Sequence, residues 1–208
     1  MPSSATTTRE RLIDAATRAF AEHGYSGASL LDITRRAGQR NRGAVHYHFG
    51  SREGLLVAVL ERHADFLAER EGELLARART TPHDDLASVF EAIVRPAVEL
   101  AEAGPSGGQY LVIVGQLVEA NDHLDDTVVE ALRRTGGYAV YALLEQRLPP
   151  LDDALRDERL ALVTSFILRS VADRARQSAV PGRPQLPTEP FVRNLVAMAA
   201  AMVTAPPG

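Results

Sequence analysis

The 208-residue sequence contains no cysteine, no lysine and no tryptophan. Without cysteine, disulfides, thiolate metal sites and cysteine nucleophiles are all excluded. The longest apolar run, 195–205 with one threonine, is well short of the roughly 20 residues that span a membrane. The first eight residues lack the apolar region of a signal peptide. We therefore expect a cytoplasmic protein with no membrane partner.

The motifs of common enzyme classes are also missing. The chain has no His-Glu-x-x-His zinc motif, no Gly-x-Ser-x-Gly elbow and no phosphate-binding P-loop. His46 and His48 are two residues apart, so a helix cannot place both rings on one face. We expect no enzymatic activity, no cofactor and no metal site.

Charge is distributed unevenly along the chain. All 23 basic residues are arginines, and against 27 acidic residues they leave a formal net charge of −4. Residues 1–52 carry eight arginines and four acids, whereas the rest of the chain has a net charge of −8. A basic end on an acidic chain is what a DNA-binding module attached to another domain requires, because neutralising phosphates supplies most non-specific affinity.

Residues 29–49 form the most informative stretch. Ser29 is placed to cap a helix, with Asp32 three residues on to return a bond to its amide, and Gly38 follows where a positive φ is needed. Asn41 can cap a second short helix, whose first turn then holds Arg42, Gly43 and Ala44. Two short helices around a glycine are common in any all-α protein. The polar and basic second helix nevertheless favours a DNA-binding helix-turn-helix.

The flanking residues extend this motif to a three-helix unit. A capping box at Thr7–Glu10 opens a helix that Gly24 closes, and its apolar residues share one face. Residues 49–53 end the second short helix and cap a long connecting helix. The unit therefore leads directly into the rest of the chain.

This arrangement resembles the TetR family of bacterial transcriptional repressors. The resemblance covers about the first sixty residues closely, and beyond them only the number and length of helices. It rests on Ala19-Phe20, Gly24-Tyr25, Ser29-Leu30, Ile33, Ala37-Gly38, Tyr47-His48-Phe49 and Ser51-Arg52-Glu53-Gly54-Leu55. Three features depart from the family pattern. The turn 39–43 is one residue longer than usual, His46 replaces a phosphate-binding tyrosine, and Arg52 replaces a lysine.

The motif and the resemblance together predict a DNA interface. Arg52 is expected to contact the phosphate backbone, and the turn around Arg42 is expected to contact base edges. The predicted DNA-binding residues are Ser29, Arg40, Asn41, Arg42, Gly43, Ala44, His46, Tyr47 and Arg52.

The remaining sequence predicts further helices and no strands. The expected ranges are 52–79, 85–104 with an interruption near Pro96, 109–120, 125–148, 152–179 and 189–204, with a proline-rich loop at 180–187. The fold class is therefore all-α. We divide it into a helix-turn-helix DNA-binding domain, 7–66, and a helical-bundle domain for effector binding and dimerisation, 67–208.

Two apolar stripes mark the last two long helices. They consist of Leu160, Val163, Ile167 and Val171 on the first helix, and Phe191, Leu195, Met198 and Met202 on the second. The stripes suit either the core of the chain or an intermolecular four-helix bundle. The resemblance favours the bundle, since family members pair through these helices and bind palindromic sites as homodimers.

The resemblance also implies a small, mostly apolar effector held inside the helical domain. With aromatic residues at 5%, a large aromatic cage is not expected. Polar residues that interrupt apolar helices are the candidates for orienting the effector, namely Tyr110, Gln116, Tyr138, Tyr141, Thr164 and Ser165.

Two functions follow from these patterns. The favoured one is a dimeric transcriptional repressor that binds a palindromic double-stranded DNA operator and is released by a small-molecule effector. The alternative is a helical small-molecule-binding or scaffold protein without sequence-specific DNA binding. Salt-dependent binding to a palindromic DNA fragment would separate the two.

Overall fold

The computed structural model describes residues 7–206 except 121–123, 179, 181 and 183. Residues 1–6 and part of the predicted proline-rich loop, 180–187, lie outside these residues. The described residues form helices and no strand, in agreement with the all-α prediction. The helices are α1 (Thr8–Gly27), α2 (Leu30–Arg36), α3 (Ala44–Phe49), α4 (Arg52–Glu61), α5 (Ala64–Ala78), α6 (Leu86–Glu102), α7 (Pro105–Ala120), α8 (Asp126–Arg133), α9 (Gly137–Arg147), α10 (Asp153–Ser178) and α11 (Thr188–Thr204).

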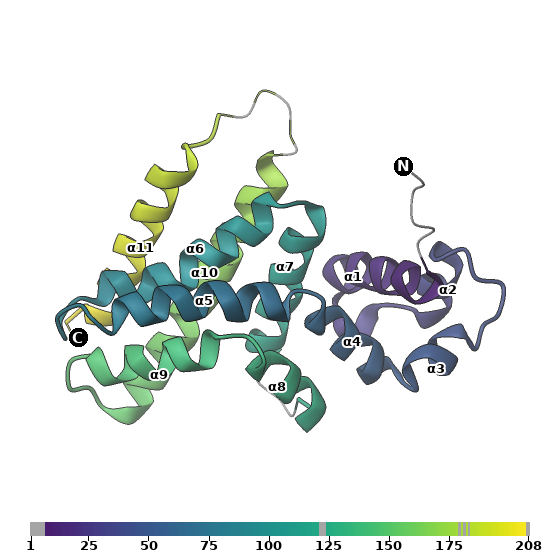
Figure 1. Cartoon of the computed structure of the whole chain (residues 1–208), viewed down its shortest axis with the longest axis horizontal. Coiled ribbons are helices and arrows are strands. Elements are labelled where there is room, and N and C mark those ends of the chain that lie inside the picture. The colour runs from purple at the N-terminus through teal and green to yellow at the C-terminus, as the bar shows by residue number, and fades with distance from the viewer. Residues whose placement is uncertain (1–6, 121–123, 179, 181, 183, 207–208) are drawn as a thin grey trace.

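Helices α1 to α4 form a small unit, which we call the head (residues 8–61), at one end of the molecule (Figure 1). Its first helix starts at the predicted capping box: Thr7 Oγ1 accepts a hydrogen bond from the Glu10 amide at 3.2 Å, and Glu10 Oε2 accepts one from the Thr7 amide at 2.7 Å. The predicted apolar face of α1, which includes Leu12 and Phe20, is fully buried. Local capping and one apolar face therefore explain this helix.

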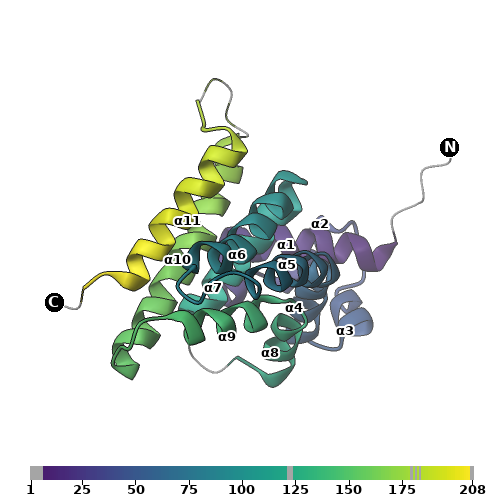
Figure 2. The same cartoon turned by 60° about the vertical axis from the view of Figure 1, so that its left-hand side comes forward.

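Helices α5 to α11 form the larger part, which we call the body (residues 64–204). Its centre is the packing of α7 against α10, and α6 contacts α5, α7, α10 and α11. The head touches the body at two places, where α1 packs on α7 and α4 packs on α8. Figure 2 shows α10 and α11 side by side at the edge remote from the head. None of the helices in the described part of the chain is long and apolar enough to cross a membrane.

The expected single helix over 52–79 is instead two helices, α4 and α5. The backbone leaves helical geometry at His63, with φ −113° and ψ 1°. Arg62 pairs with Asp14 of α1, and His63 Nε2 lies 3.2 Å from Ser106 Oγ of α7. Tertiary contacts to two other helices accompany the break, and no glycine or proline marks it.

The expected helix over 125–148 is also wrong, because α8 ends at Arg133 and α9 begins at Gly137. Gly136 lies in the break and packs against α5 so closely that a Cβ there would be 2.7 Å from Glu71 Cβ. Helix α6 runs through Pro96 without the expected interruption, and α7 begins at Pro105 rather than at 109. The long helix α10 and the final helix α11 match their predicted ranges closely.

Candidate nucleic-acid interface and effector cavity

Helices α2 and α3 carry the predicted helix-turn-helix. Ser29 caps α2, its Oγ accepting a hydrogen bond from the Asp32 amide at 3.3 Å, and Gly38 has the expected positive φ of 71°. The Asp32 carboxylate does not return a bond to Ser29; Arg36 Nε holds its Oδ2 at 2.7 Å. An arginine one turn along the helix competes for that carboxylate.

The turn before α3 differs from its prediction. Gly43 occupies the N-cap position of α3, and Asn41 Oδ1 accepts a hydrogen bond from the Gly43 amide at 2.9 Å. Asn41 therefore closes a local turn instead of capping the helix. Arg42 and Gly43 precede α3, so they are presented by the loop and not by a helical turn.

Most of the predicted DNA-binding side chains are exposed on the head, at its edge away from the body (Figure 1). Tyr47 is 83% exposed, which is unusual for a large aromatic side chain. Within the described residues, neither Arg40 nor Arg42 forms an ion pair. Two predicted residues differ: the Ala44 side chain is buried, so this residue can offer only its backbone, and Arg52 is half-buried.

Arg52 is engaged within the head. Its Nη1 donates a hydrogen bond to the Tyr25 carbonyl at 2.6 Å, and its guanidinium lies 5.7 Å from the centre of the Tyr25 ring. The Tyr25 hydroxyl donates to Glu53 Oε1 at 2.8 Å, and burial together with Glu53 raises the pKa of Tyr25 to about 12. Arg52 thus ties the start of α4 to the end of α1. A phosphate contact from Arg52 stays a prediction.

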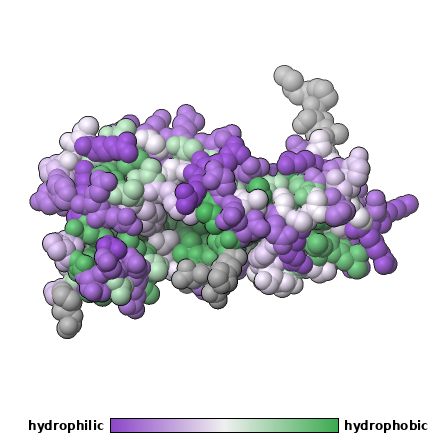
Figure 3. All heavy atoms as spheres, turned by 90° about the horizontal axis from the view of Figure 1, so that it is seen from below, coloured by the Kyte–Doolittle hydropathy of each residue, from purple (hydrophilic) through white to green (hydrophobic). Residues whose placement is uncertain are grey.

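A cavity of about 580 Å³ lies in the body, between α5, α6, α7, α9 and α10. Four of the six predicted effector residues line it: Tyr110, Tyr138, Tyr141 and Thr164. Gln116 and Ser165 are not among its lining residues. Figure 3 views the molecule from below and shows an apolar area in its middle, bordered by hydrophilic residues. Because four polar residues from three helices meet in one apolar hollow, this cavity fits the general design of a small-molecule site.

Tyr141 and Thr164 form a short polar chain in the cavity wall. Thr164 Oγ1 donates to the Leu160 carbonyl at 2.6 Å, and the Tyr141 hydroxyl lies 2.6 Å from the same Oγ1. A threonine has one hydroxyl proton, so Tyr141 is the donor in the second bond. Burial raises the pKa of Tyr141 to about 12.

Sequence reasoning missed Glu71, a carboxyl in the cavity wall that is only 8% exposed. Its Oε2 has no hydrogen-bond partner among the described residues. Burial raises the pKa of Glu71 to about 8, and the Gly136 amide opposes that shift. The signal was present in the sequence, because Glu71 shares the apolar face of α5 with Leu67, Leu74 and Leu75. A charged residue in such a stripe marks a candidate functional group.

The cavity is connected to the junction of α4 and α5 through Tyr110. The Tyr110 ring lines the cavity, and it packs edge-on against the ring of His63 with 5.3 Å between centroids. Burial, and after it the charge of Arg62, lowers the pKa of His63. A second link runs from the end of α8, where Arg134 pairs with Glu61 at the end of α4. Tyr110 therefore belongs to the cavity wall and also contacts the junction between α4 and α5.

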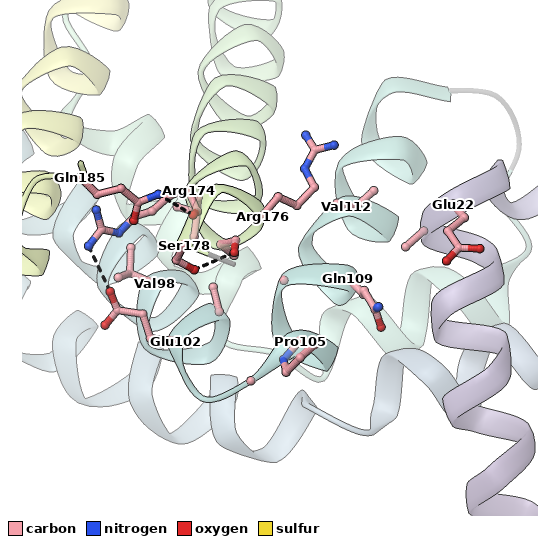
Figure 4. Close-up of a pocket in the computed structure, with 16 residues that line it drawn as sticks. Glu22, Val98, Glu102, Pro105, Gln109, Val112, Arg174, Arg176, Ser178 and Gln185 are labelled. Atoms are coloured by element: carbon pink, nitrogen blue, oxygen red, sulfur yellow. Dashed lines mark hydrogen bonds and ion pairs between the residues drawn. The ribbon is translucent and has the colours of Figure 1, made fainter. Parts of the chain in front are cut away.

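A larger hollow of about 750 Å³ lies where the end of α1 meets α7 and the end of α10 (Figure 4). Several of its polar groups are hydrogen-bonded. Arg174 donates to the Leu186 carbonyl at 2.8 Å and to Glu102 Oε1 at 3.3 Å, and Gln185 Nε2 donates to the Arg174 carbonyl at 3.0 Å. This hollow is a groove between the head and the body. Unlike the cavity around Glu71, its described lining contains no buried side-chain oxygen or nitrogen that lacks a hydrogen-bond partner.

The structure separates the predicted dimerisation residues into two groups. Leu160, Val163, Ile167, Val171 and Leu195 are buried inside the chain, where they pack in its own core. Phe191 and Met202 are half-buried, and Met198 is 44% exposed. Leu162 on α10 was not in the predicted set and is 55% exposed. A one-residue or two-residue step around a helix moves a side chain from core to surface.

Two family matches cover most of these residues. Residues 12–59 match the family described as "Bacterial regulatory proteins, tetR family", and residues 91–202 match "Tetracyclin repressor-like, C-terminal domain". The HTH-type transcriptional repressor AcnR of Corynebacterium diphtheriae is 30% identical over 135 residues, which are 61% of this chain and 64% of AcnR. The chain spans between 34% and 64% of the length of AcnR relatives from three Corynebacterium species.

Solved structures share the fold at low sequence identity. A HlyIIR mutant protein superimposes with a TM-score of 0.62 at 16% identity, covering 99% of this chain and all of that one. AibR in complex with isovaleryl coenzyme A and operator DNA gives a TM-score of 0.53 at 16% identity, covering 96% of this chain and all of AibR. Since the matched families span the helix-turn-helix and more than half of the whole chain, this protein is a member of the TetR family of bacterial transcriptional regulators.

Proposed function

We propose that this regulator is a homodimeric repressor that binds a palindromic operator through α3 and the preceding loop, and leaves it when an effector enters the cavity around Glu71. The observation that carries the DNA-binding part is the cluster of exposed groups at one edge of the head. Arg40, Arg42, His46 and Tyr47 are exposed there, and Tyr47 is 83% exposed. Unpaired arginines next to a helix that fits the major groove are suited to phosphate and guanine contacts.

The proposed dimer uses the outward faces of α10 and α11. Leu162 of α10 and Met198 of α11 are exposed apolar side chains on neighbouring helices, and the exposed Ala197 and Ala201 allow a second copy to approach closely. Pairing through this face places two heads on one assembly, and a two-fold assembly matches a palindromic site.

The proposed release step runs through residues shared by the cavity and the connection. An effector that displaces Tyr110 also disturbs its contact with His63, at the point where α4 and α5 separate. Helix α4 is the part of the head that leads into α5 of the body. A small change at the junction of α4 and α5 therefore alters the spacing of the two recognition helices in the dimer. An effector can act only through a difference in its affinity for the two arrangements. AibR, a structural neighbour solved in complex with isovaleryl coenzyme A and operator DNA, supports the same combination here.

A reporter assay tests this function. The DNA upstream of the gene for this protein is fused to a reporter in a host cell, and the protein is expressed from a separate plasmid. We expect reporter output to fall with the wild-type protein and to stay high with Arg42→Ala at equal protein level. Equal output with and without the wild-type protein would contradict repression at this DNA and favour a helical binding protein without operator recognition.

A further inference from the structure

The wall of the cavity around Glu71 contains acidic side chains and no basic ones among the described residues. The described residues that line it include two carboxyls, Glu71 and Glu145, and neither an arginine nor a histidine. Lysine is missing from the whole sequence. Arg133 contacts the wall from outside: its guanidinium lies 5.2 Å from the centre of the Tyr138 ring, and it is not itself a lining residue. A wall of this kind disfavours anionic ligands such as carboxylates or phosphates.

One oxygen of the Glu71 carboxyl, Oε2, lacks a hydrogen-bond partner within the described residues. Glu71 is only 8% exposed. A buried carboxyl oxygen left unsatisfied destabilises the fold. Space at this oxygen depends on Gly136, since a Cβ there would lie 3.0 Å from Oε2.

The rest of the wall suits a cation with an apolar body. Tyr110, Tyr138 and Tyr141 present aromatic rings, which attract cations through their faces. Burial raises the pKa of both Tyr110 and Tyr141, and the charge of nearby Glu71 raises both further. Leucine, isoleucine and valine side chains from α5, α6, α7 and α10 complete the lining. One buried acid, aromatic rings and aliphatic walls thus meet in the same space.

We propose that the effector of this regulator is a mostly apolar amine, bound as its ammonium ion with an N–H donated to Oε2 of Glu71. The identification as an effector rests on the proposed function; the preference for a cation rests on the cavity alone. On binding, the carboxyl of Glu71 gives its proton to solvent and becomes the counter-ion of the ammonium group. No other group in the cavity changes its bonds.

Three probes of equal chain length test the preference: decylammonium, decanol and decanoate. Their affinities for the full-length protein at pH 7 are measured by isothermal titration calorimetry. We expect decylammonium to bind roughly ten- to a hundredfold more tightly than decanol, as a hydrogen bond to a charged group provides, and decanoate to bind most weakly. Glu71→Gln should reduce the ratio of decylammonium to decanol affinity to about twofold or less. Glu145→Gln, which removes the cavity's exposed carboxyl, should leave most of the ratio intact.

A second readout does not depend on a variant. Decylammonium binding to the wild-type protein in two buffers of different ionisation enthalpy should reveal close to one proton released per site, and decanol binding should release none. Tightest binding of decanoate, equal binding of decanol and decylammonium, no binding of decylammonium, or no proton release would each overturn the inference. Operator binding is measured on the same protein without probes. Its failure would overturn the repressor proposal and leave the charge preference standing, whereas intact operator binding with no amine preference would overturn only this inference.

Discussion

The ring of Tyr110 stands between the cavity and the break in the connecting helix, packed edge-on against His63 at 5.3 Å between centroids. His63 does not line the cavity, so its replacement can separate effector binding from effector response. His63 also contacts Ser106 at the start of α7, which fixes the junction against the body.

His63→Ala should therefore weaken the coupling between the two sites. Allosteric couplings of about 1 to 3 kcal/mol correspond to roughly 5- to 150-fold changes in affinity. We expect decylammonium to weaken operator binding within that range for the wild-type protein, and by about twofold or less for the variant. Titrating labelled operator DNA with and without the amine measures both. His83→Ala, at an exposed histidine, is the control, and an unchanged response in His63→Ala would contradict the proposed path.

Glu71 should make stability depend on pH. A free glutamate titrates near 4.3, whereas burial raises the folded-state pKa of Glu71 to about 8. Between these two pKa values the folded chain holds a proton that the unfolded chain has lost. The resulting contribution to the free energy of unfolding is fully present below about pH 4.3 and is lost above about pH 8. Between these pH values the free energy of unfolding falls by about 1.4 kcal/mol for each pH unit.

Denaturant unfolding of the wild-type protein and Glu71→Gln at pH 5, 6, 7 and 8 measures this dependence. The free energy of unfolding of the wild-type protein should fall relative to the variant as pH rises. Glu145→Gln should behave like the wild-type protein, since its side chain is exposed. Parallel curves for wild type and Glu71→Gln would show that Glu71 keeps an ordinary pKa in the fold.

Gly136 and Gly72 form a matched pair of glycines beside Glu71. A Cβ at Gly136 would lie 2.7 Å from Glu71 Cβ, whereas a Cβ at Gly72 would meet nothing within 4 Å. Gly136→Ala should lower the free energy of unfolding by about 1 to 3 kcal/mol through overpacking. Gly72→Ala, inside α5, should raise it by about 1 kcal/mol through helix propensity. Equal effects of the two changes in thermal unfolding would contradict the close approach at Gly136.

Leu162 and Leu195 distinguish the dimer face from the core. Leu162 is 55% exposed on α10, and Leu195 is 3% exposed on α11. An aspartate at an interface prevents pairing, whereas an unpaired carboxylate in the core destabilises the fold itself. Leu162→Asp should give a folded monomer by sedimentation and circular dichroism, and Leu195→Asp should unfold. A dimeric Leu162→Asp protein would move the interface elsewhere.

Local patterns in the sequence predict most of this structure. The capping box at Thr7, the cap at Ser29 and the positive φ at Gly38 depend on near neighbours, and each is present as expected. The break at His63 depends on contacts with other helices and does not follow from helix propensity. The break at Gly136 combines a close contact with α5 and a local signal that the prediction overlooked, since Gly136 and Gly137 are poor helix formers.

The functional residues divide in the same way. Four predicted polar residues meet in the cavity because each interrupts the apolar face of its own helix. Glu71 followed the same rule and was overlooked, since a single glutamate in a charged helix is more often on the surface. Leu160 and Leu195 were assigned to a second copy because a stripe pattern does not say which neighbour covers it.

A measurement of direct DNA binding tests whether this protein recognises an operator. Fluorescence anisotropy with a palindromic fragment from upstream of the gene, and with a scrambled copy, is recorded for the wild-type protein, Arg42→Ala and the control Arg79→Ala, an exposed arginine at the end of α5. We expect the wild-type protein to prefer the palindrome, with a log-log salt slope of about −5 if a dimer neutralises about six phosphates. Arg42→Ala should lose roughly 1 to 3 kcal/mol on the palindrome and little on the scrambled copy, and Arg79→Ala should bind like the wild type. Equal affinity of the wild-type protein for both fragments, or no salt-dependent binding at all, would contradict an operator-binding regulator.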